Sequence, residues 1–424
     1  MFCASGSVIR PQHSLVLLAL CALNACTTTV TRDSAEEPEA AAETPAVEAA
    51  TPAATRAPEP ARPISRISIA AVGDMMIGTD YPENHLPDDD GVGFLAAVTP
   101  FISAPEVAFG NLEGVLVDGG EPGKKCKNPK ACYLFRSPTR YAAHYRNAGF
   151  DVLSLANNHA RDFGEEGRTA TMQALDGVGI HHSGREGEFA SFEVNDVTVA
   201  VLAYAVTRNS NLLLDYEIAA YTVAEHAMTH DIVIVSFHGG AEGRDAMHLP
   251  FAEEEYYGEP RGDVVLFARR MVDAGADLVL GHGPHVVRAV ERYKDRLIAY
   301  SLGNFATYYG ISVDGVKGIA PILLTTLDGE GRFLEGEIVS TVQVRPAGPT
   351  IDPANRALKL VRDLSIEDFG NPGVRFLPNG KLLPAERSDI SRLEAAPTDN
   401  RAAGAMSVPP GHVIERNRAQ RGKP

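Results

Sequence analysis

Five short apolar runs recur along the central part of this chain, and each is long enough to form one buried β-strand. The expected strands lie at residues 66–72, 106–110, 151–156, 231–237 and 277–281. Segments with a helical pattern lie between several of them, each followed by a glycine that favours a helix stop, at residues 139–148, 165–178 and 263–274. Strands that alternate with helices in this way predict an α/β fold.

Antiparallel pairing is expected where turn-forming dipeptides interrupt apolar stretches. Such stretches lie at residues 192–205, at 288–305 and around 328–331, with Asn-Asp, Lys-Asp and Asp-Gly turns respectively. The predicted fold therefore combines a parallel α/β part with antiparallel additions. No internal repeat is visible in the sequence.

The N-terminal region has the features of an export signal. The apolar run at residues 15–23 is about half the ~20 residues that a bilayer helix needs. It leads into Leu23-Asn24-Ala25-Cys26, which resembles a bacterial lipobox, so we expect residues 1–25 to be a lipoprotein signal peptide and Cys26 to be lipidated. The alternatives are an ordinary signal peptide with an incidental cysteine, or a buried helix.

Composition divides the remainder of the 424 residues. We expect residues 26–64, rich in Pro, Ala and Glu, to be the lipid anchor and a disordered tether. The predicted folded domain spans 65–345, followed by a C-terminal extension and loose tail at 346–424. A content of 44% apolar residues excludes wholesale disorder, and a net charge of −16 argues against a nucleic-acid binder.

Side chains of metal-ligand type follow all five expected strands. They are Asp74, then Asn111 and Glu113, then Asn158 and His159, then His238 and Glu242, then His282 and His285. Each residue alone would be an ordinary turn, cap or boundary residue. Because ligands bind beyond the carboxyl ends of strands in open α/β sheets, the recurrence predicts one shared site. Oxygen and imidazole donors suit Mn²⁺, Zn²⁺ or Fe.

The order of these motifs resembles that of the calcineurin-like metallophosphoesterases, and more closely that of the CapA family, which is linked to poly-γ-glutamate capsule synthesis. The shared elements are Gly73-Asp74, Asn111-Leu112-Glu113, Asn157-Asn158-His159 with Asp162 and Gly164, His238 through Glu242, Gly281 through His285, and the hexapeptide Tyr300 through Phe305. The resemblance covers about residues 66–305. It implies a single large domain built as a four-layer αββα sandwich.

The same resemblance assigns roles to individual residues. It implies metal ligation by Asp74, Asn158, His238, His282 and His285, with Asn111 or Glu113 where a bridging carboxylate would lie. His159 would donate a proton to a leaving oxygen. Glu242 and Asn304 would support the ligands or contact substrate, or else form structural turns.

Two positions depart from the phosphoesterase pattern. Met76 stands where those enzymes place a histidine, and Asn111 is neutral where they place a bridging aspartate. Asp74 and Glu113 then supply the anionic ligands, so the site would hold one or two divalent ions.

The function that follows is that of a lipid-anchored cell-envelope protein on the periplasmic face of a membrane, acting in capsule or poly-γ-glutamate synthesis. Its chemistry would be metal-dependent hydrolysis or transfer on an anionic polymer or phosphorylated substrate. Its expected partners are a capsule-synthesis ligase and small membrane proteins. The alternatives are a non-catalytic polymer-binding scaffold, or a periplasmic nucleotidase or phosphodiesterase.

Two cysteines remain in the predicted folded domain, Cys126 and Cys132. In an oxidising compartment their closeness in sequence predicts a disulfide. The surrounding loop is lysine-rich, and it is either a solvated loop or a contact for an anionic polymer or phosphate.

Overall fold

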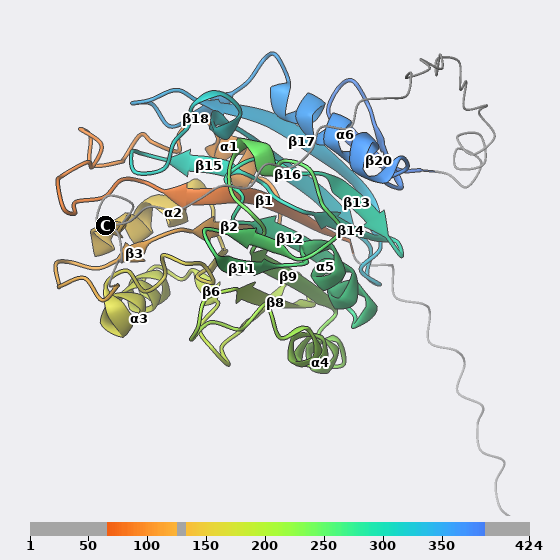
Figure 1. Cartoon of the computed structure of the whole chain (residues 1–424), viewed down its shortest axis with the longest axis horizontal. Helices are drawn as coiled ribbons and strands as arrows, with labels where there is room; N and C mark the ends of the chain where they lie inside the picture. Colours follow the sequence, from red (N-terminus) through yellow and green to blue (C-terminus); the bar gives the residue numbers. More distant parts are fainter. Residues whose placement is uncertain (1–65, 125–132, 386–424) are drawn as a thin grey trace, which may run out of the picture. The chain divides into compact units, whose positions relative to one another are not determined.

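A computed structural model describes residues 66–124 and 133–385 (Figure 1). Cys26, Cys126 and Cys132 lie outside these described residues, as do the expected signal peptide, tether and tail, so the expectations for them stay predictions. Within the described ranges, no helix combines the length and the apolar character needed to cross a membrane.

The larger of two main sheets has ten strands within the described residues. Eight of them lie in the spatial order β19 (Val374–Phe376), β20 (Lys381–Pro384), β17 (Phe333–Gln343), β16 (Ile319–Leu327), β1 (Ile67–Met76), β2 (Val107–Leu112), β5 (Val152–Ser154) and β6 (His181–Ser183). In addition, β15 (Asn304–Thr307) pairs with β1, and β18 (Pro349–Ile351) pairs with β17. The half from β1 to β6 is parallel, and the half from β16 to β19 is antiparallel.

The smaller sheet has six strands among the described residues, in the order β13 (Val290–Tyr293), β14 (Arg296–Ala299), β12 (Leu278–His282), β9 (Ile232–His238), β8 (Val197–Ala205) and β7 (Ala190–Val194). Its four central strands are parallel and its two edge strands are antiparallel. Two short ribbons complete the strands: β3 (Val115–Leu116) with β4 (Arg136–Ser137), and β10 (Glu254–Tyr256) with β11 (Glu259–Gly262).

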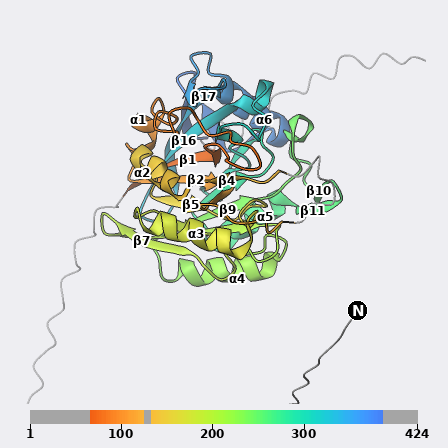
Figure 2. The ribbon, with the colours of Figure 1, turned by 90° about the vertical axis from the view of Figure 1, so that its left-hand side faces the viewer.

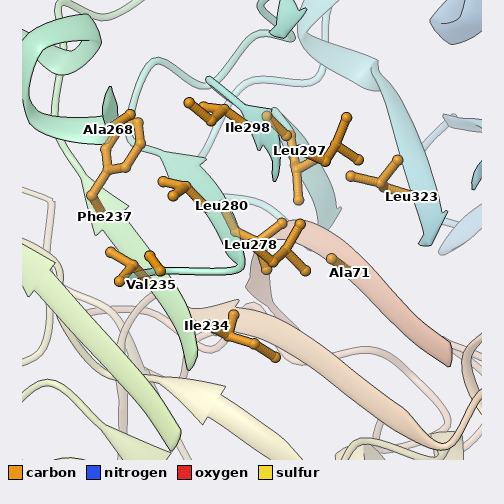
Figure 3. Close-up of a cluster of buried hydrophobic side chains, with 14 of the residues drawn as sticks. Ala71, Ile234, Val235, Phe237, Ala268, Leu278, Leu280, Leu297, Ile298 and Leu323 are labelled. Atoms are coloured by element: carbon orange, nitrogen blue, oxygen red, sulfur yellow. The ribbon is translucent and has the colours of Figure 1, made fainter. Parts of the chain in front are cut away.

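The inner faces of the two sheets share one hydrophobic core. Side chains of β1 alternate between two clusters: Ile69 and Ala71 belong to the core that also contains the smaller sheet, whereas Ala70 and Val72 belong to a second cluster. Figure 3 shows Ile234 and Leu278 of the smaller sheet beside Ala71. A strand that is buried on both faces reads as a continuous apolar run, which explains the pattern at residues 66–72.

Helices cover the outer faces of both sheets (Figure 2). On the larger sheet these are α1 (Thr99–Ile102), α2 (Ala142–Ala148) and α3 (Gly164–Asp176), and on the smaller sheet α4 (Tyr216–Ala227) and α5 (Val264–Asp273). The ring of Phe267 in α5 lies 5.7 Å from the ring of Phe237 in β9. The four-layer αββα prediction is therefore confirmed. Helix α6 (Arg356–Phe369) contacts β17, β16 and β13, so it touches both sheets.

The local predictions are confirmed at the strands and turns. All five apolar runs overlap observed strands, and all three helical patterns overlap α2, α3 and α5. Two predicted hairpin turns have positive φ at both central residues: Asn195 with Asp196, and Lys294 with Asp295. Such angles are typical of tight two-residue hairpin turns.

The larger sheet continues through β18, β20 and β19 after residue 345. In the described ranges, the 3₁₀ turns η2 (Thr139–Tyr141), η3 (Arg244–Ala246) and η4 (Gly315–Gly318) lie in connecting segments.

Candidate metal centre

The two sheets bring their strand ends together at Asp74. Within the larger sheet, Asp74 is the register partner of Asn111 in β2 and of Asn304 in β15. From the smaller sheet, His282 places Nδ1 3.5 Å from Asp74 Oδ1. The loop that follows β12 places His285 Nδ1 3.0 Å from Asp74 Oδ2. Residues that are far apart in sequence thus meet at one carboxylate, as the strand-end argument predicts.

A backbone irregularity aims Asp74 into this site. The pairing of β1 with β2 shifts register between Ala71 and Asp74, and Asp74 N–H donates to Gly303 O at 2.8 Å. A Cβ atom at Gly73 would lie 1.9 Å from Gly303 O, so only glycine fits beside that carbonyl. Bulges of this kind re-aim side chains next to functional sites. The Gly-Asp pair is therefore a structural requirement of this site.

Asp74 is fully buried and ionised. Asn111 Nδ2 donates to its Oδ1 at 2.9 Å. Burial acts to raise the pKa of Asp74, but the neighbouring imidazoles of His282 and His285 outweigh burial and hold the pKa below its ordinary value. The carboxylate can thus serve as an anionic ligand.

Glu113 accepts no hydrogen bond inside the described structure. It is 0% exposed, and neither carboxylate oxygen has a hydrogen-bond partner. The nearest imidazole nitrogens are His285 Nε2 at 3.6 Å and His159 Nε2 at 3.9 Å. Burial, with the charge of Asp74, raises the pKa of Glu113 to about 8. A buried carboxylate without hydrogen bonds lowers the stability of the folded state unless a cation binds it.

Other sequence-predicted ligand atoms also lack hydrogen-bond partners. His238 Nε2, His282 Nε2 and Asn158 Oδ1 have no hydrogen-bond partner among the described residues. One ligand atom each from Asp74, Glu113 and His285 lies within 4.8 Å of the others. Oxygen and imidazole donors left open in a buried cluster are the set that a divalent transition-metal ion binds. The residues present therefore fit such an ion.

His238 is oriented by the strand pairing. It is the register partner of His282, and its Nδ1 lies 3.5 Å from Asn111 Nδ2. Burial lowers the pKa of His238 well below its ordinary value, so the ring is neutral and one of its two nitrogens has a free lone pair for a ligand bond.

The sequence left open whether Asn111 or Glu113 lies where a bridging carboxylate would be. Asn111 Oδ1 accepts a hydrogen bond from Asn157 Nδ2 at 3.1 Å, so the amide group of Asn111 faces Asp74 with its NH₂. Glu113 offers two free oxygens instead. The anionic position beside Asp74 is thus filled by Glu113, while Asn111 supports Asp74.

Asn304 fixes the position of His285. Its Oδ1 accepts from His285 Nδ1 at 2.8 Å, and its Nδ2 faces three backbone carbonyls, those of His285, Ser312 and Lys317. His285 itself has a φ of 57°. Burial acts to lower the pKa of His285, but the charges of Glu113 and Asp74 outweigh burial and raise the pKa to about 10.

His159 lies beside the ligand cluster rather than in it. Its Nδ1 lies 2.7 Å from Asp162 Oδ2, and its ring packs on Phe135 with the ring centroids 4.3 Å apart. Burial lowers the pKa of His159, although the Asp162 charge opposes this shift. Met76 is buried against Phe135 and Ile311, so it fills space with apolar packing.

Sequence reasoning missed Arg261, which is 2% exposed and belongs to β11. Its Nε donates to Gly240 O at 2.9 Å, and its Nη1 lies 3.0 Å from Glu242 Oε1. Its Nη2 has no hydrogen-bond partner. This nitrogen lies against Gly283, since a Cβ atom added to Gly283 would be only 3.2 Å from it. An arginine inside a short ribbon carries no local signal that it will reach a strand-end site.

The two packed sheets and the carboxylate–imidazole cluster at their strand ends define an α/β sandwich protein with a candidate metal centre. Residues 68–309 match the model of the family described as bacterial capsule synthesis protein PGA_cap. The chain belongs to this family.

Relatives with assigned names agree with this membership. The chain is 30% identical over 284 residues to "PGA biosynthesis protein CapA" of Bacillus subtilis, covering 63% of this chain and 70% of the relative. It is 29% identical over 273 residues to "Capsule biosynthesis protein CapA" of Bacillus anthracis, covering 59% of this chain and 62% of the relative.

Solved structures resemble the chain only distantly. A putative 5′-nucleotidase from Staphylococcus aureus aligns with a TM-score of 0.41 at 17% identity, covering 71% of this chain and 58% of that one. The calcineurin-like phosphoesterase YfkN from Bacillus subtilis aligns with a TM-score of 0.35 at 13% identity, covering 73% and 98%. At these scores the likeness says nothing about activity.

Proposed function

We propose that this protein acts in poly-γ-glutamate capsule synthesis as a metal-dependent hydrolase or transferase, cleaving or exchanging a γ-glutamyl or phosphoryl bond. Family membership and the names of the two CapA relatives support the pathway. The observation that carries the chemistry is the set of buried, unpartnered donors on Glu113, His238 and His282 around the ionised Asp74.

In this proposal Asp74, Glu113, His238, His282 and His285 hold one or two divalent ions, with Mn²⁺, Zn²⁺ or Fe as candidates. Asn158, with its free Oδ1, is the remaining candidate ligand. A bound cation would supply Lewis-acid polarisation and activation of water.

His159 is the proposed proton carrier. Asp162 accepts from Nδ1–H, which fixes the tautomer and leaves the Nε2 lone pair directed towards Glu113, 3.9 Å away. A histidine that is held by a carboxylate in this way commonly acts as a general acid or base. Phe135 holds the ring plane, and its backbone N–H donates to Asp162 Oδ2 at 2.8 Å, which holds the carboxylate. His159 therefore takes or gives a proton at Nε2.

Arg261 supplies fixed positive charge to the same site. Because Glu242 and a backbone carbonyl already hold two of its nitrogens, the guanidinium cannot turn away, and its free Nη2 stays available. A preorganised cation in a buried site stabilises negative charge that develops on a reacting group. Arg261 is thus placed to orient an anionic substrate oxygen.

The test combines elemental analysis with a panel of phosphodiesters and γ-linked glutamate oligomers. The purified protein should contain a transition metal and hydrolyse one class, and His238→Ala should lose metal and turnover together. His248→Ala is the matched control, because His248 is exposed and lies outside the site. Metal without turnover would favour a polymer-binding scaffold, and turnover of phosphodiesters alone would favour a phosphodiesterase.

The cellular setting is a further part of the proposal. We propose that Cys26 carries a lipid that holds the protein on the periplasmic face of a membrane, beside a capsule-synthesis ligase and small membrane proteins. The lipobox-like sequence before Cys26 supports the anchor, and the capsule-synthesis family supports the partners.

A further inference from the structure

A cavity of about 260 Å³ opens beside the metal centre. Segments from three parts of the chain form it: the segment after β3, the loop between β5 and α3, and the loop after β8. Its charged and polar lining residues are Lys124, Asn157, Asn158, Arg161, Thr207, Arg208 and Ser210. Three of these seven carry positive charge and none carries negative charge.

The positive charge of this cavity is only partly compensated. Lys124 Nζ lies 3.4 Å from Asp162 Oδ1. Arg161 Nε lies 3.2 Å from Glu165 Oε2, but Glu165 also pairs with Arg168 and Arg185, so three guanidinium groups share one carboxylate. A cationic cavity therefore persists in a protein whose net charge is −16.

Arg208 is the least committed of the three cations. It is exposed, and its side chain makes no ion pair or hydrogen bond with any residue in the described ranges. An arginine fork that is not engaged by the protein can bind a carboxylate or phosphate through two parallel hydrogen bonds.

The cavity is joined to the metal centre by short contacts on two sides. On one side, Asn157 lines the cavity and donates to Asn111, which donates to Asp74. On the other, Lys124 pairs with Asp162, the residue that accepts from His159. A group held in the cavity therefore lies next to the residues proposed to carry out the chemistry.

We propose that this cavity is a substrate subsite that binds an anionic oxygen group, a carboxylate or a phosphate, of the segment adjoining the reacting bond. The inference rests on the proposed function and adds recognition to it. In a γ-linked glutamate chain every residue carries a free α-carboxylate, so the group next to any scissile bond is anionic. Arg208 and Arg161 bind that group, and Lys124 places it near His159.

Binding rather than turnover tests the subsite. The full-length protein is titrated with a γ-linked glutamate pentamer, with the same pentamer amidated at its α-carboxylates, and with inorganic phosphate. We expect the charged pentamer to bind and the amidated one to bind at least tenfold more weakly. Raising NaCl from 50 to 300 mM should weaken binding, because salt screens exposed charges. Arg208→Gln should weaken binding about five- to tenfold, as expected for one exposed charged contact.

Two further variants separate the subsite from the metal chemistry. Arg362→Gln removes an exposed arginine of α6 and should bind as the wild type does. His238→Ala should keep binding that depends on Arg208 even without turnover, so failure of catalysis alone leaves the subsite intact.

Competition assigns the source of the anion. Displacement of the pentamer by phosphate supports one shared anion site, and binding of phosphate alone supports a site for a phosphorylated substrate. Equal affinity of wild type and Arg208→Gln for both probes, or equal affinity for the charged and amidated pentamers together with no phosphate binding, would overturn the proposal.

Discussion

Replacing Glu113 by glutamine should change stability in opposite directions with and without metal. The carboxyl group is 0% exposed, neither oxygen has a hydrogen-bond partner, and burial raises its pKa to about 8, so folding of the metal-free protein at neutral pH carries the cost of protonating a group that is ionised in the unfolded chain. Glutamine keeps the shape and is neutral in both the folded and the unfolded state. Because it avoids the cost of protonation but still leaves a buried amide without hydrogen-bond partners, Glu113→Gln should stabilise the metal-free protein by about 1–2 kcal/mol at neutral pH.

With bound metal, the wild type should be more stable than Glu113→Gln. At a concentration of one hundred times Kd, a ligand that binds only the folded state adds about 2.7 kcal/mol to the free energy of unfolding. For a domain of this size, 1 kcal/mol corresponds to about 2 °C in Tm. We therefore expect Glu113→Gln to melt about 2–4 °C higher than wild type in chelator. With saturating Mn²⁺ or Zn²⁺ the wild type should gain about 5 °C and the variant much less.

Differential scanning calorimetry of both proteins, with chelator and with metal, provides the measurement. Glu335→Gln is the control, because Glu335 is half-exposed on β17 and should leave both Tm values unchanged. A variant that melts lower than wild type in chelator and still gains the full metal-dependent shift would refute this account of Glu113.

Three further outcomes are expected. Asn304→Ala removes the hydrogen bonds that orient His285 and should weaken metal affinity about 10- to 100-fold, measured by competition with a chromophoric chelator; unchanged affinity would show that Asn304 is only a turn residue. Cys26→Ser should release the protein from the membrane fraction or leave the precursor unprocessed, and unchanged fractionation on a gradient would contradict lipidation. Mass spectrometry of non-reduced peptides should show Cys126 joined to Cys132, whereas two free thiols in the exported protein would exclude the disulfide.

The parts of the fold that sequence could predict are those with a local signal. Apolar runs mark the strands, because a strand buried on both faces must be apolar throughout. The strand-end cluster was predictable because neighbouring parallel strands finish at the same edge of a sheet, so the residues at their ends converge, as Asp74 and Asn111 do with Asn111 Nδ2 2.9 Å from Asp74 Oδ1. To predict that these residues meet, it is enough to know that the strands are parallel neighbours. Short turns and helices between successive strands favour that arrangement.

The parts that sequence could not predict depend on contacts between distant segments. Arg261 reaches the centre because Gly240 O and Glu242 hold its guanidinium, and no periodic pattern announces such a contact. Strands β19 and β20 are three and four residues long, too short for an alternation signal, yet they extend the larger sheet, because β20 pairs with β17 and β19 pairs with β20. Pairing across the sheet, rather than propensity, determines these strands.

The position of Glu113 at the centre follows from the backbone, which stays extended beyond the end of β2. Glu113 N–H donates to Met75 O at 2.9 Å, so pairing with β1 continues past the end of β2. Residues two apart in an extended strand share a face, which places Asn111 and Glu113 on the same side. Once His285 gives up its proton to act as a ligand, the carboxylates of Asp74, Glu113 and Glu242 carry three negative charges against the one positive charge of Arg261, which pairs with Glu242, so two negative charges remain among the described residues. One divalent cation neutralises two charges, so this arrangement favours a single ion, in agreement with the loss of the second anionic position at Asn111.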